Sequence, residues 1–159
     1  MGKEIERKFL VNGNEWRDGV SPVHTCQGYL VIDSDRTIRV RLQEERAFLT
    51  IKGKTEGISR SEYEYEIPAA DARELLDGLC LQPYIEKNRY EIFHAGLKWE
   101  VDEFLKDNYG LVVAEVELES EEQQVDLPPW VGEEVSRDPR YGNANLVSNP
   151  YAKWGRKSR

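Results

Sequence analysis

The stretch that decides the fold is Glu4-Ile5-Glu6-Arg7-Lys8-Phe9-Leu10-Val11, close to the start of the chain. The apolar side chains Ile5, Phe9 and Val11 all fall on odd-numbered positions, and the turn pair Asn12-Gly13 follows them. A period of two residues is the pattern of a β-strand, and Asn-Gly is a common stop signal for one. We therefore expect a strand over residues 4–11 with one apolar face.

The other face of this strand carries Glu4, Glu6 and Lys8. Side chains two positions apart on a strand lie on the same face, roughly 6.6 Å apart along it. Two carboxylates in this arrangement can converge on one hard cation such as Mg²⁺ or Mn²⁺, which favours carboxylate and phosphate oxygens. The same pattern also describes a charged strand face in solvent. The octet alone leaves both interpretations open.

Composition limits the classes of function. A length of 159 residues favours a single domain over 1–159. The net charge of -8 disfavours nucleic acid as a partner, because it repels polyanions at long range. Cys26 and Cys80 have no metal-ligand spacing and indicate a reducing compartment, while His24 and His94 stand apart from any ligand pattern. The apolar runs are too short to span a membrane and no signal peptide is evident, so we expect a cytoplasmic protein without a membrane partner.

Further strands are expected wherever apolar and polar residues alternate, at 27–31, 37–42, 48–52, 62–67, 85–93, 97–104 and 111–119. Helix is expected at 69–77, in a short turn around Trp16, after the capping box that begins at Ser120, and near 141–147. About eight short strands separated by polar turns indicate an antiparallel barrel or a strongly curved sheet. The predicted fold class is mainly β, with a few short peripheral helices.

The polar faces of these strands are unusually rich in charge. They carry Glu4, Glu6, Lys8, Arg39, Arg41, Lys52, Glu62, Glu64, Lys87, Arg89, Asp102, Glu115 and Glu117. Charges of one sign recur two positions apart on single strands, which is mildly destabilising on a sheet. The arrangement makes sense if both signs face an enclosed lumen, where arginine and lysine hold phosphate oxygens and the acids hold a metal ion. A half-buried sheet with a charged outer face is the alternative.

The opening Glu4-Ile5-Glu6-Arg7-Lys8 resembles the E-x-E-x-K signature of the CYTH superfamily, the triphosphate tunnel metalloenzymes. Further similarities follow in the family's order, at Gln27-Gly28-Tyr29-Leu30, Ile38-Arg39-Val40-Arg41, Leu49-Thr50-Ile51-Lys52, Ser59-Arg60-Ser61-Glu62-Tyr63-Glu64, Glu86-Lys87-Asn88-Arg89-Tyr90, Glu100-Val101-Asp102 and Ala114-Glu115-Val116-Glu117-Leu118. The tail around Arg140-Tyr141 also resembles the small bacterial members. The signature alone is weak, but the ordered set is specific and covers nearly the whole chain.

The resemblance implies an eight-stranded antiparallel barrel whose lumen binds a triphosphate together with Mg²⁺ or Mn²⁺. The implied metal ligands are Glu4, Glu6, Asp102, Glu115 and Glu117, with Glu64 either joining them or orienting a cation. The implied phosphate-binding residues are Lys8, Arg39, Arg41, Lys87 and Arg89. Lys52 and Tyr29 match a lysine and a tyrosine that are proposed to activate the attacking water, although Lys52 could equally grip phosphate. Glu62 has a less certain role, and Glu66 and Glu119 are expected in solvent at strand ends.

The activity implied by the resemblance is hydrolysis of inorganic triphosphate to pyrophosphate and phosphate. A thiamine triphosphatase and a class IV-type adenylyl cyclase are alternatives on the same fold. An alternative from another class is a non-catalytic polyphosphate or nucleotide sensor, which needs the cations but has less need for so many carboxylates. We expect a small-molecule triphosphate as the substrate and a monomer or a homodimer as the assembly.

Overall fold

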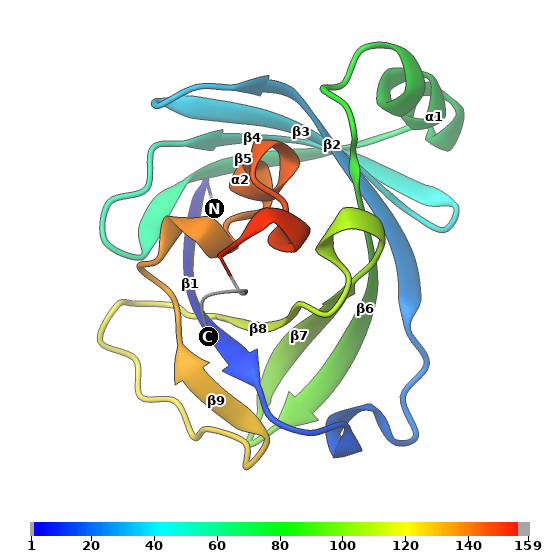
Figure 1. Cartoon of the computed structure of the whole chain (residues 1–159). Coiled ribbons are helices and arrows are strands. Elements are labelled where there is room, and N and C mark those ends of the chain that lie inside the picture. The colour runs from blue at the N-terminus through cyan, green and yellow to red at the C-terminus, as the bar shows by residue number, and fades with distance from the viewer. Residues whose placement is uncertain (1, 156–159) are drawn as a thin grey trace.

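The computed structural model of the protein describes residues 2–155, and in this part the chain forms one closed antiparallel barrel (Figure 1). Its strands are β1 (Lys3–Val11), β2 (Val23–Ile32), β3 (Arg36–Gln43), β4 (Arg46–Gly53), β5 (Ser59–Ile67), β6 (Ile85–His94), β7 (Leu97–Phe104), β8 (Val112–Glu117) and the short β9 (Val131–Glu134). They follow the order β5-β4-β3-β2-β6-β7-β8-β1-β9, and a further pairing of β1 with β5 closes the ring. The predicted eight-stranded barrel is therefore confirmed, and it consists of β1 to β8.

The ninth strand was not predicted. β9 pairs with the later half of β1, whereas the first residues of β1 pair with β5. One edge of a single strand therefore serves two partners in succession. β9 is only four residues long and its sequence, Val131-Gly132-Glu133-Glu134, has little strand character, so the pairing depends on the free edge that β1 offers.

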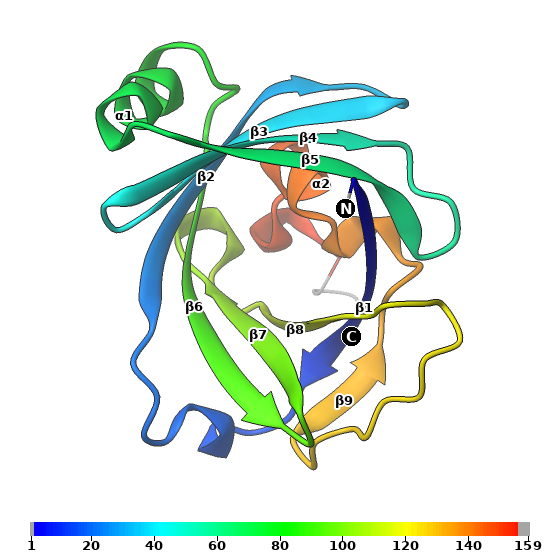
Figure 2. The same ribbon diagram turned by 180° about the vertical axis from the view of Figure 1, so that it is seen from behind.

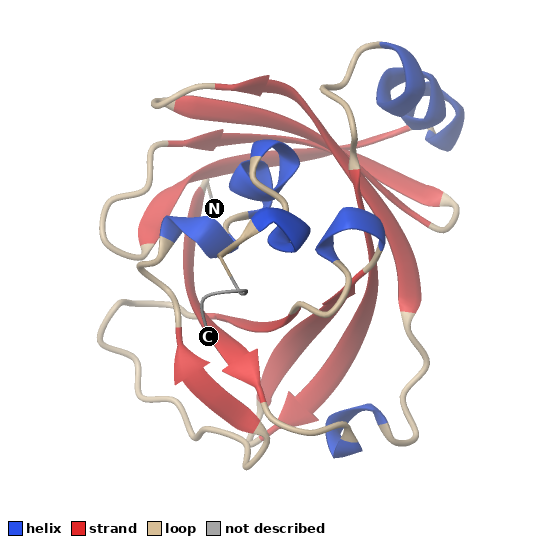
Figure 3. Cartoon of the chain, in the orientation of Figure 1, coloured by secondary structure: helices blue, strands red, loops and turns tan. Residues whose placement is uncertain are grey.

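The helices lie outside the barrel wall or across one of its mouths, as the blue segments of Figure 3 show. They are α1 (Ala69–Gly78) and α2 (Asn143–Ser148), with the 3₁₀ turns η1 (Glu15–Arg17), η2 (Lys106–Asn108), η3 (Pro139–Tyr141) and η4 (Tyr151–Lys153). The predicted helix at 69–77, the turn around Trp16 and the helix near 141–147 are confirmed within a few residues.

The helix expected after Ser120 is wrong. Gln123 donates its backbone N–H to the carbonyl of Ser120, and its side-chain oxygen accepts a hydrogen bond from the backbone of Glu119. The polar residues of the expected capping box thus stabilise a turn. Glu66 and Glu119 are both exposed, as expected from their positions at strand ends.

The apolar outer faces of the strands are covered by different parts of the chain. Phe9 of β1 and Trp99 of β7 belong to a buried cluster that also includes Trp16 of η1. On another side α1 packs over β3 and β4. A Cβ atom at Gly28 of β2 would lie 2.8 Å from Leu76 of α1, so this close approach requires glycine. Much of the apolar packing is thus outside the barrel, and the lumen is left for polar side chains.

The C-terminal segment closes one mouth of the barrel. In Figure 1 the segments η3, α2 and η4 lie across the end of the barrel that faces the viewer, and in Figure 2 they are seen on the far side. Tyr141, Leu146 and Val147 of this segment pack into one buried cluster with Tyr29 and Phe104 of the barrel. The lumen is therefore capped at one end by apolar packing.

Candidate active site

A cavity of about 720 Å³ lies inside the barrel. All but one of the site residues predicted from the sequence line it, namely Glu4, Glu6, Lys8, Tyr29, Arg39, Arg41, Lys52, Glu64, Lys87, Arg89, Glu115 and Glu117. Its described wall holds nine basic and nine acidic side chains, although the chain as a whole carries a net charge of -8. The negative charge of the protein is therefore concentrated on the outside, and the cavity itself does not repel an anion.

Lys52 is fixed at the acidic side of the cavity. Its Nζ lies 3.0 and 3.2 Å from the two carboxylate oxygens of Glu4 and 3.5 Å from Glu62, and its side chain is only 7% exposed. Burial lowers the pKa of Lys52, the charge of Arg39 adds to this effect, and Glu4 opposes it. The pKa of Glu4 is lowered to about 2, because Lys52 and Arg60 outweigh the burial that would raise it.

The carboxylates of Glu6 and Glu117 have too little positive charge near them to offset burial and the neighbouring negative charges, so their pKa values are raised. Burial raises the pKa of Glu6 to about 8, and the neighbouring charges of Glu115 and Glu4 contribute to this rise. Burial also raises the pKa of Glu117, together with the charges of Glu4 and Glu62. A divalent cation among these oxygens would relieve the repulsion, and an all-carboxylate donor set is the kind that hard cations prefer. The chemistry of these residues therefore fits a hard divalent cation.

Arg39 and Arg41 of β3 form a cationic group with one shared acid. Oε2 of Glu64 accepts hydrogen bonds from Arg39 at 3.3 Å, Arg41 at 3.0 Å and the hydroxyl of Thr50 at 2.8 Å. Burial lowers the pKa of Arg41 to about 10, and the like charges of Arg39 and Arg89 add to the effect. Glu64 thus contacts two cations in this structure, and a role as metal ligand stays a prediction for this residue. Crowded, poorly hydrated guanidinium groups of this kind favour phosphate.

Lys87 and Arg89 of β6 are both held by Asp102 of β7, which lies behind the cavity wall. Arg89 makes two hydrogen bonds to Asp102, at 2.7 and 2.8 Å, and Nζ of Lys87 lies 2.8 Å from the same carboxylate. Asp102 is 2% exposed, and although burial would raise its pKa, Arg89 and Lys87 together outweigh burial, so the pKa lies below its ordinary value. Both of its oxygens are engaged by cations, so a role as metal ligand stays a prediction for this residue.

Tyr29 and Lys52 line the same cavity, but they do not form a hydrogen bond with each other among the residues that the structure describes. The hydroxyl oxygen of Tyr29 instead accepts a hydrogen bond of 3.0 Å from Nε2 of Gln27, a side chain that is fully buried. The hydroxyl proton of Tyr29 therefore remains available to a ligand. The sequence did not single out Gln27, although it shares a strand face with Tyr29 at a spacing of two.

The C-terminal segment contributes directly to the site. Nζ of Lys8 lies 3.3 Å from Glu115 and donates to the backbone carbonyl of Tyr141 at 3.4 Å, and Nζ of Lys87 lies 3.1 Å from Oδ1 of Asn143. No periodic pattern in the tail pointed to these contacts. Arg60, which lies 3.3 Å from Glu4, was also missed, although its alternation with Glu62 and Glu64 was a usable signal.

Residues 2–151 match the family model of the CYTH domain. The chain belongs to the CYTH family. It is 52% identical over 151 residues to an inorganic triphosphatase of Acetivibrio thermocellus, which covers 95% of this chain and 97% of that protein. It is 39% identical over 149 residues to an inorganic triphosphatase of Nitrosomonas europaea, covering 91% of this chain and 96% of the relative.

Solved structures of similar proteins share the barrel of this CYTH protein. The crystal structure of the inorganic triphosphatase NE1496 matches with a TM-score of 0.64 at 37% sequence identity, over 91% of this chain and 93% of that one. A putative adenylyl cyclase from Hippeastrum, HpAC1, described as having a dominant triphosphatase activity, matches with a TM-score of 0.55 at 15% identity, over 74% of this chain and 80% of that one. The second likeness concerns the fold alone.

CYTH triphosphatases are in general metal-dependent, in agreement with the carboxylate group described above. Within residues 2–155, no helix is both long enough and apolar enough to cross a membrane.

Proposed function

We propose that this CYTH protein hydrolyses inorganic triphosphate to pyrophosphate and phosphate inside its barrel. The observation that carries the proposal is the capped cavity. Its wall combines buried cations with carboxylates whose negative charge is not fully balanced by nearby positive charge. Phosphoryl transfer requires charge neutralisation, in-line placement and a positioned nucleophile more than it requires covalent catalysis. The full-length relatives named as inorganic triphosphatases support the same activity.

The phosphate groups would be bound by Lys8, Arg39, Arg41, Lys87 and Arg89. These side chains come from β1, β3 and β6 and reach the cavity from different directions. Arginine can bind phosphate oxygens through two parallel N–H groups, whereas lysine acts as a point charge. Acids hold each of these cations in place before the substrate enters, so little side-chain ordering is left to occur on binding.

The metal site would be formed by Glu4, Glu6, Glu115 and Glu117, with Glu64 and Asp102 as further candidate ligands, and we propose Mg²⁺ or Mn²⁺ as the ion. When bound, the ion would neutralise phosphate charge and lower the pKa of a water molecule. The contribution of the protein is a set of carboxylates gathered by the register of β1 and β8, where Lys8 faces Glu115 and Glu6 faces Glu117.

Lys52 and Tyr29 would activate the attacking water. Lys52 would accept a proton at Nζ, and its lowered pKa supplies part of the neutral form that this role needs. Tyr29, fixed by Gln27, would direct its hydroxyl proton toward the water or the phosphate. We further propose that a single domain carries this chemistry and that the protein acts in the cytoplasm as a monomer or a homodimer.

The alternatives on the same fold make different demands on the cavity. A thiamine triphosphatase requires aromatic side chains against the thiamine rings, and a cyclase requires a pocket for adenine. Among the described residues that line the cavity, the aromatic ones are Tyr29 and Phe48. The remaining wall is dominated by charge, which favours a substrate that consists of phosphate alone.

The test is a substrate comparison with the purified protein. Triphosphate, ATP and thiamine triphosphate are each incubated with Mg²⁺, with Mn²⁺ or with EDTA, and the products are separated and quantified. We expect triphosphate to be preferred over ATP by at least about tenfold in kcat/KM, because the described wall of the cavity is mostly charged and offers few aromatic side chains to a nucleoside. EDTA should abolish the activity. Equal rates on ATP, or release of cyclic AMP, would favour the alternatives, and tight binding without turnover would indicate a sensor.

A further inference from the structure

The outer face of the β2–β6 pair carries a group of side chains that the tunnel does not use. Along β2 the side chains alternate, so that Thr25 and Gln27 are completely buried while His24 is exposed and Cys26 half-buried. Cys26 is the direct cross-strand partner of Glu86 on β6. His24, two residues before Cys26, shares its face and lies diagonally opposite Glu86.

The three side chains converge on one point. One ligand atom from each of His24, Cys26 and Glu86 lies within 4.8 Å of the other two, and Nε2 of His24 is 3.0 Å from Oε2 of Glu86. Zinc binds imidazole nitrogen and carboxylate oxygen at about 2.0–2.2 Å and thiolate sulfur at about 2.3 Å. Donors gathered this closely can therefore reach one ion with small changes in side-chain torsion.

We propose that His24, Cys26 and Glu86 form a second metal site, on the outside of the barrel, for a thiophilic divalent cation of the zinc class. The donor set is one nitrogen, one sulfur and one oxygen, which differs in kind from the all-oxygen group of the tunnel. Thiolate and imidazole ligands select zinc-like ions over Mg²⁺ and Mn²⁺. Three protein ligands leave the fourth tetrahedral position for water or for a small ligand.

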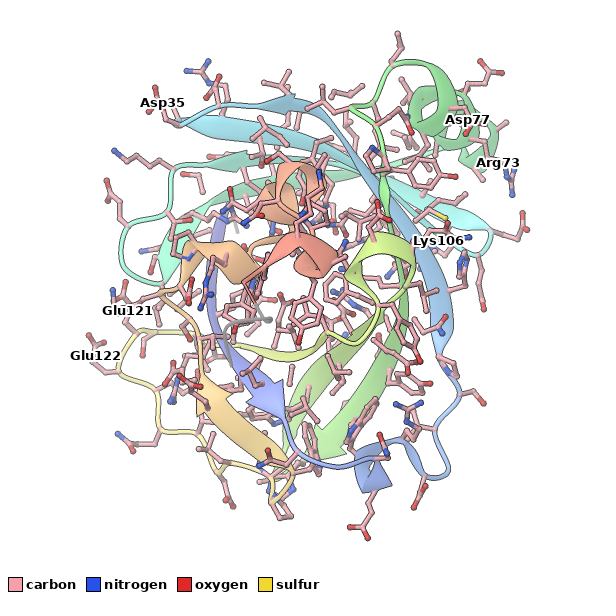
Figure 4. All side chains as sticks on the ribbon, viewed as in Figure 1. Asp35, Arg73, Asp77, Lys106, Glu121 and Glu122 are labelled. Atoms are coloured by element: carbon pink, nitrogen blue, oxygen red, sulfur yellow. The ribbon has the colours of Figure 1, made fainter. Side chains whose placement is uncertain are left out.

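The cluster lies on an accessible face of the barrel. Glu86 makes a second ion pair, in which Nζ of Lys106 lies 3.8 Å from Oε1, so an incoming ion would compete with this lysine for one carboxylate oxygen. Figure 4 labels Lys106 on the outside of the barrel, on the side of α1. Because His24 is half exposed, an ion has access, and its binding would release the thiol proton.

Such a site would link the two strands that carry part of the tunnel. The inward side chains of β2 include Tyr29, and those of β6 include Lys87 and Arg89. An ion held by His24 and Cys26 on one strand and Glu86 on the other would clamp this pair from outside. The inference does not depend on the proposed hydrolysis of triphosphate.

The test uses Co²⁺ as a spectroscopic substitute for zinc. Cobalt bound to a thiolate gives a sulfur-to-metal charge-transfer absorption in the near ultraviolet, and no cysteine lines the described tunnel. We expect this band to saturate at one equivalent of Co²⁺ in the reduced wild-type protein, to disappear on addition of Zn²⁺ and to persist in excess Mg²⁺. Cys26→Ser should abolish the band, and His24→Gln and Glu86→Gln should each weaken cobalt affinity at least about tenfold.

Cys80→Ser is the matched control. Cys80 is the other free cysteine. It packs in the apolar cluster with Ala72 and Leu76 of α1 and is not one of the three proposed ligands, so this variant should keep the full band. Circular dichroism of each variant checks that it is folded. Absence of the band in folded wild-type protein would overturn the proposal, as would a band that survives in Cys26→Ser or cobalt affinity unchanged in His24→Gln. The readout is independent of phosphate release, so loss of the proposed function would leave it interpretable.

Discussion

Lys52 is a buried lysine whose two nearest partners are the carboxylates of Glu4 and Glu62. Ion pairing favours its charged form, while burial and Arg39 favour the neutral one, and the net effect is a pKa below 10.5. A lowered pKa is compatible with the role of proton acceptor, but it does not by itself single out Lys52, because burial also lowers the pKa of Lys87 to about 8. The base role of Lys52 stays a prediction.

If Lys52 is the proton acceptor, we expect an alkaline optimum, with a rate that rises as Lys52 loses its proton. Lys52→Ala should mainly lower kcat and flatten the alkaline rise, and Tyr29→Phe should lower kcat less. The measurement is kcat and kcat/KM of both variants across pH. A raised KM with an unshifted profile and near-normal kcat in Lys52→Ala would refute the base role and leave Lys52 as a phosphate ligand.

Glu6 is a second residue whose ionisation matters. Its pKa of about 8 lies above the ordinary value of 4.5, so the folded state binds this proton more tightly than the unfolded state. Without metal, the stability of the protein therefore falls as pH rises from about 4.5 to about 8. Glu6→Gln should remove this dependence without unfolding the protein and should lower activity at least about tenfold by weakening the metal site.

Thermal unfolding of wild type and Glu6→Gln in EDTA between pH 5 and pH 9 checks the first part, and activity against Mg²⁺ concentration checks the second. Wild-type activity in Glu6→Gln at low Mg²⁺ would exclude Glu6 as a ligand.

At the scale of the element, the neighbouring strands β6 and β7 of the barrel wall are joined by a buried ion pair between Arg89 and Asp102. Arg89 and Asp102 are direct cross-strand partners, and Lys87 shares the same carboxylate. A depressed pKa in the folded state means that Asp102 contributes stability above its unfolded pKa near 3.9. This contribution is lost as pH falls below that value.

Asp102→Asn should therefore lower the free energy of unfolding by about 3–5 kcal/mol at pH 7, because it leaves buried cations without their counter-charge. The matched control is Glu103→Gln on the next position of β7. Glu103 pairs with Arg17 in a partly exposed contact of 3.1 Å, and its loss should cost under about 1 kcal/mol. Denaturant unfolding of both variants makes the comparison. Weakened metal binding with unchanged stability in Asp102→Asn would instead support Asp102 as a ligand.

For the whole molecule, the C-terminal segment is both a cap and part of the site. Leu146 is 1% exposed in the cluster that closes one mouth, and nearby Tyr141 and Asn143 contact Lys8 and Lys87. If Lys8 and Lys87 bind the substrate as proposed, we expect changes in the cap to affect both stability and substrate binding.

Leu146→Ala should cost about 2–5 kcal/mol of unfolding free energy and should raise the KM for triphosphate. Leu79→Ala, at a side chain that is 69% exposed beside α1, should change stability by no more than about 0.5 kcal/mol and leave KM unaltered. The measurements are denaturant unfolding and steady-state kinetics. A destabilised Leu146→Ala protein with wild-type KM would show that the packing of the cap does not affect substrate binding.

The sequence by itself determined, within a few residues, where β1 to β8 lie and which face of each of these strands is polar. Alternation is a local property with a period of two, so Glu4, Glu6 and Lys8 had to share a face wherever β1 lay in the fold. The same argument applied to Arg39 with Arg41 and to Lys87 with Arg89. For this reason most of the charged residues of the cavity wall could be predicted from the alternation, whereas the closed eight-stranded barrel was implied by the resemblance to the CYTH superfamily.

Only the tertiary structure decided how distant strands and the tail meet. Register and packing between segments far apart in the chain decide three features. These are the pairing of Asp102 with Arg89, the contacts of the C-terminal segment with Lys8 and Lys87, and the four-residue strand β9. The meeting of His24 and Cys26 with Glu86 is of the same kind, since some sixty residues separate the two strands' contributions. Local periodicity carries no information about such contacts, because closing the barrel sets them all at once.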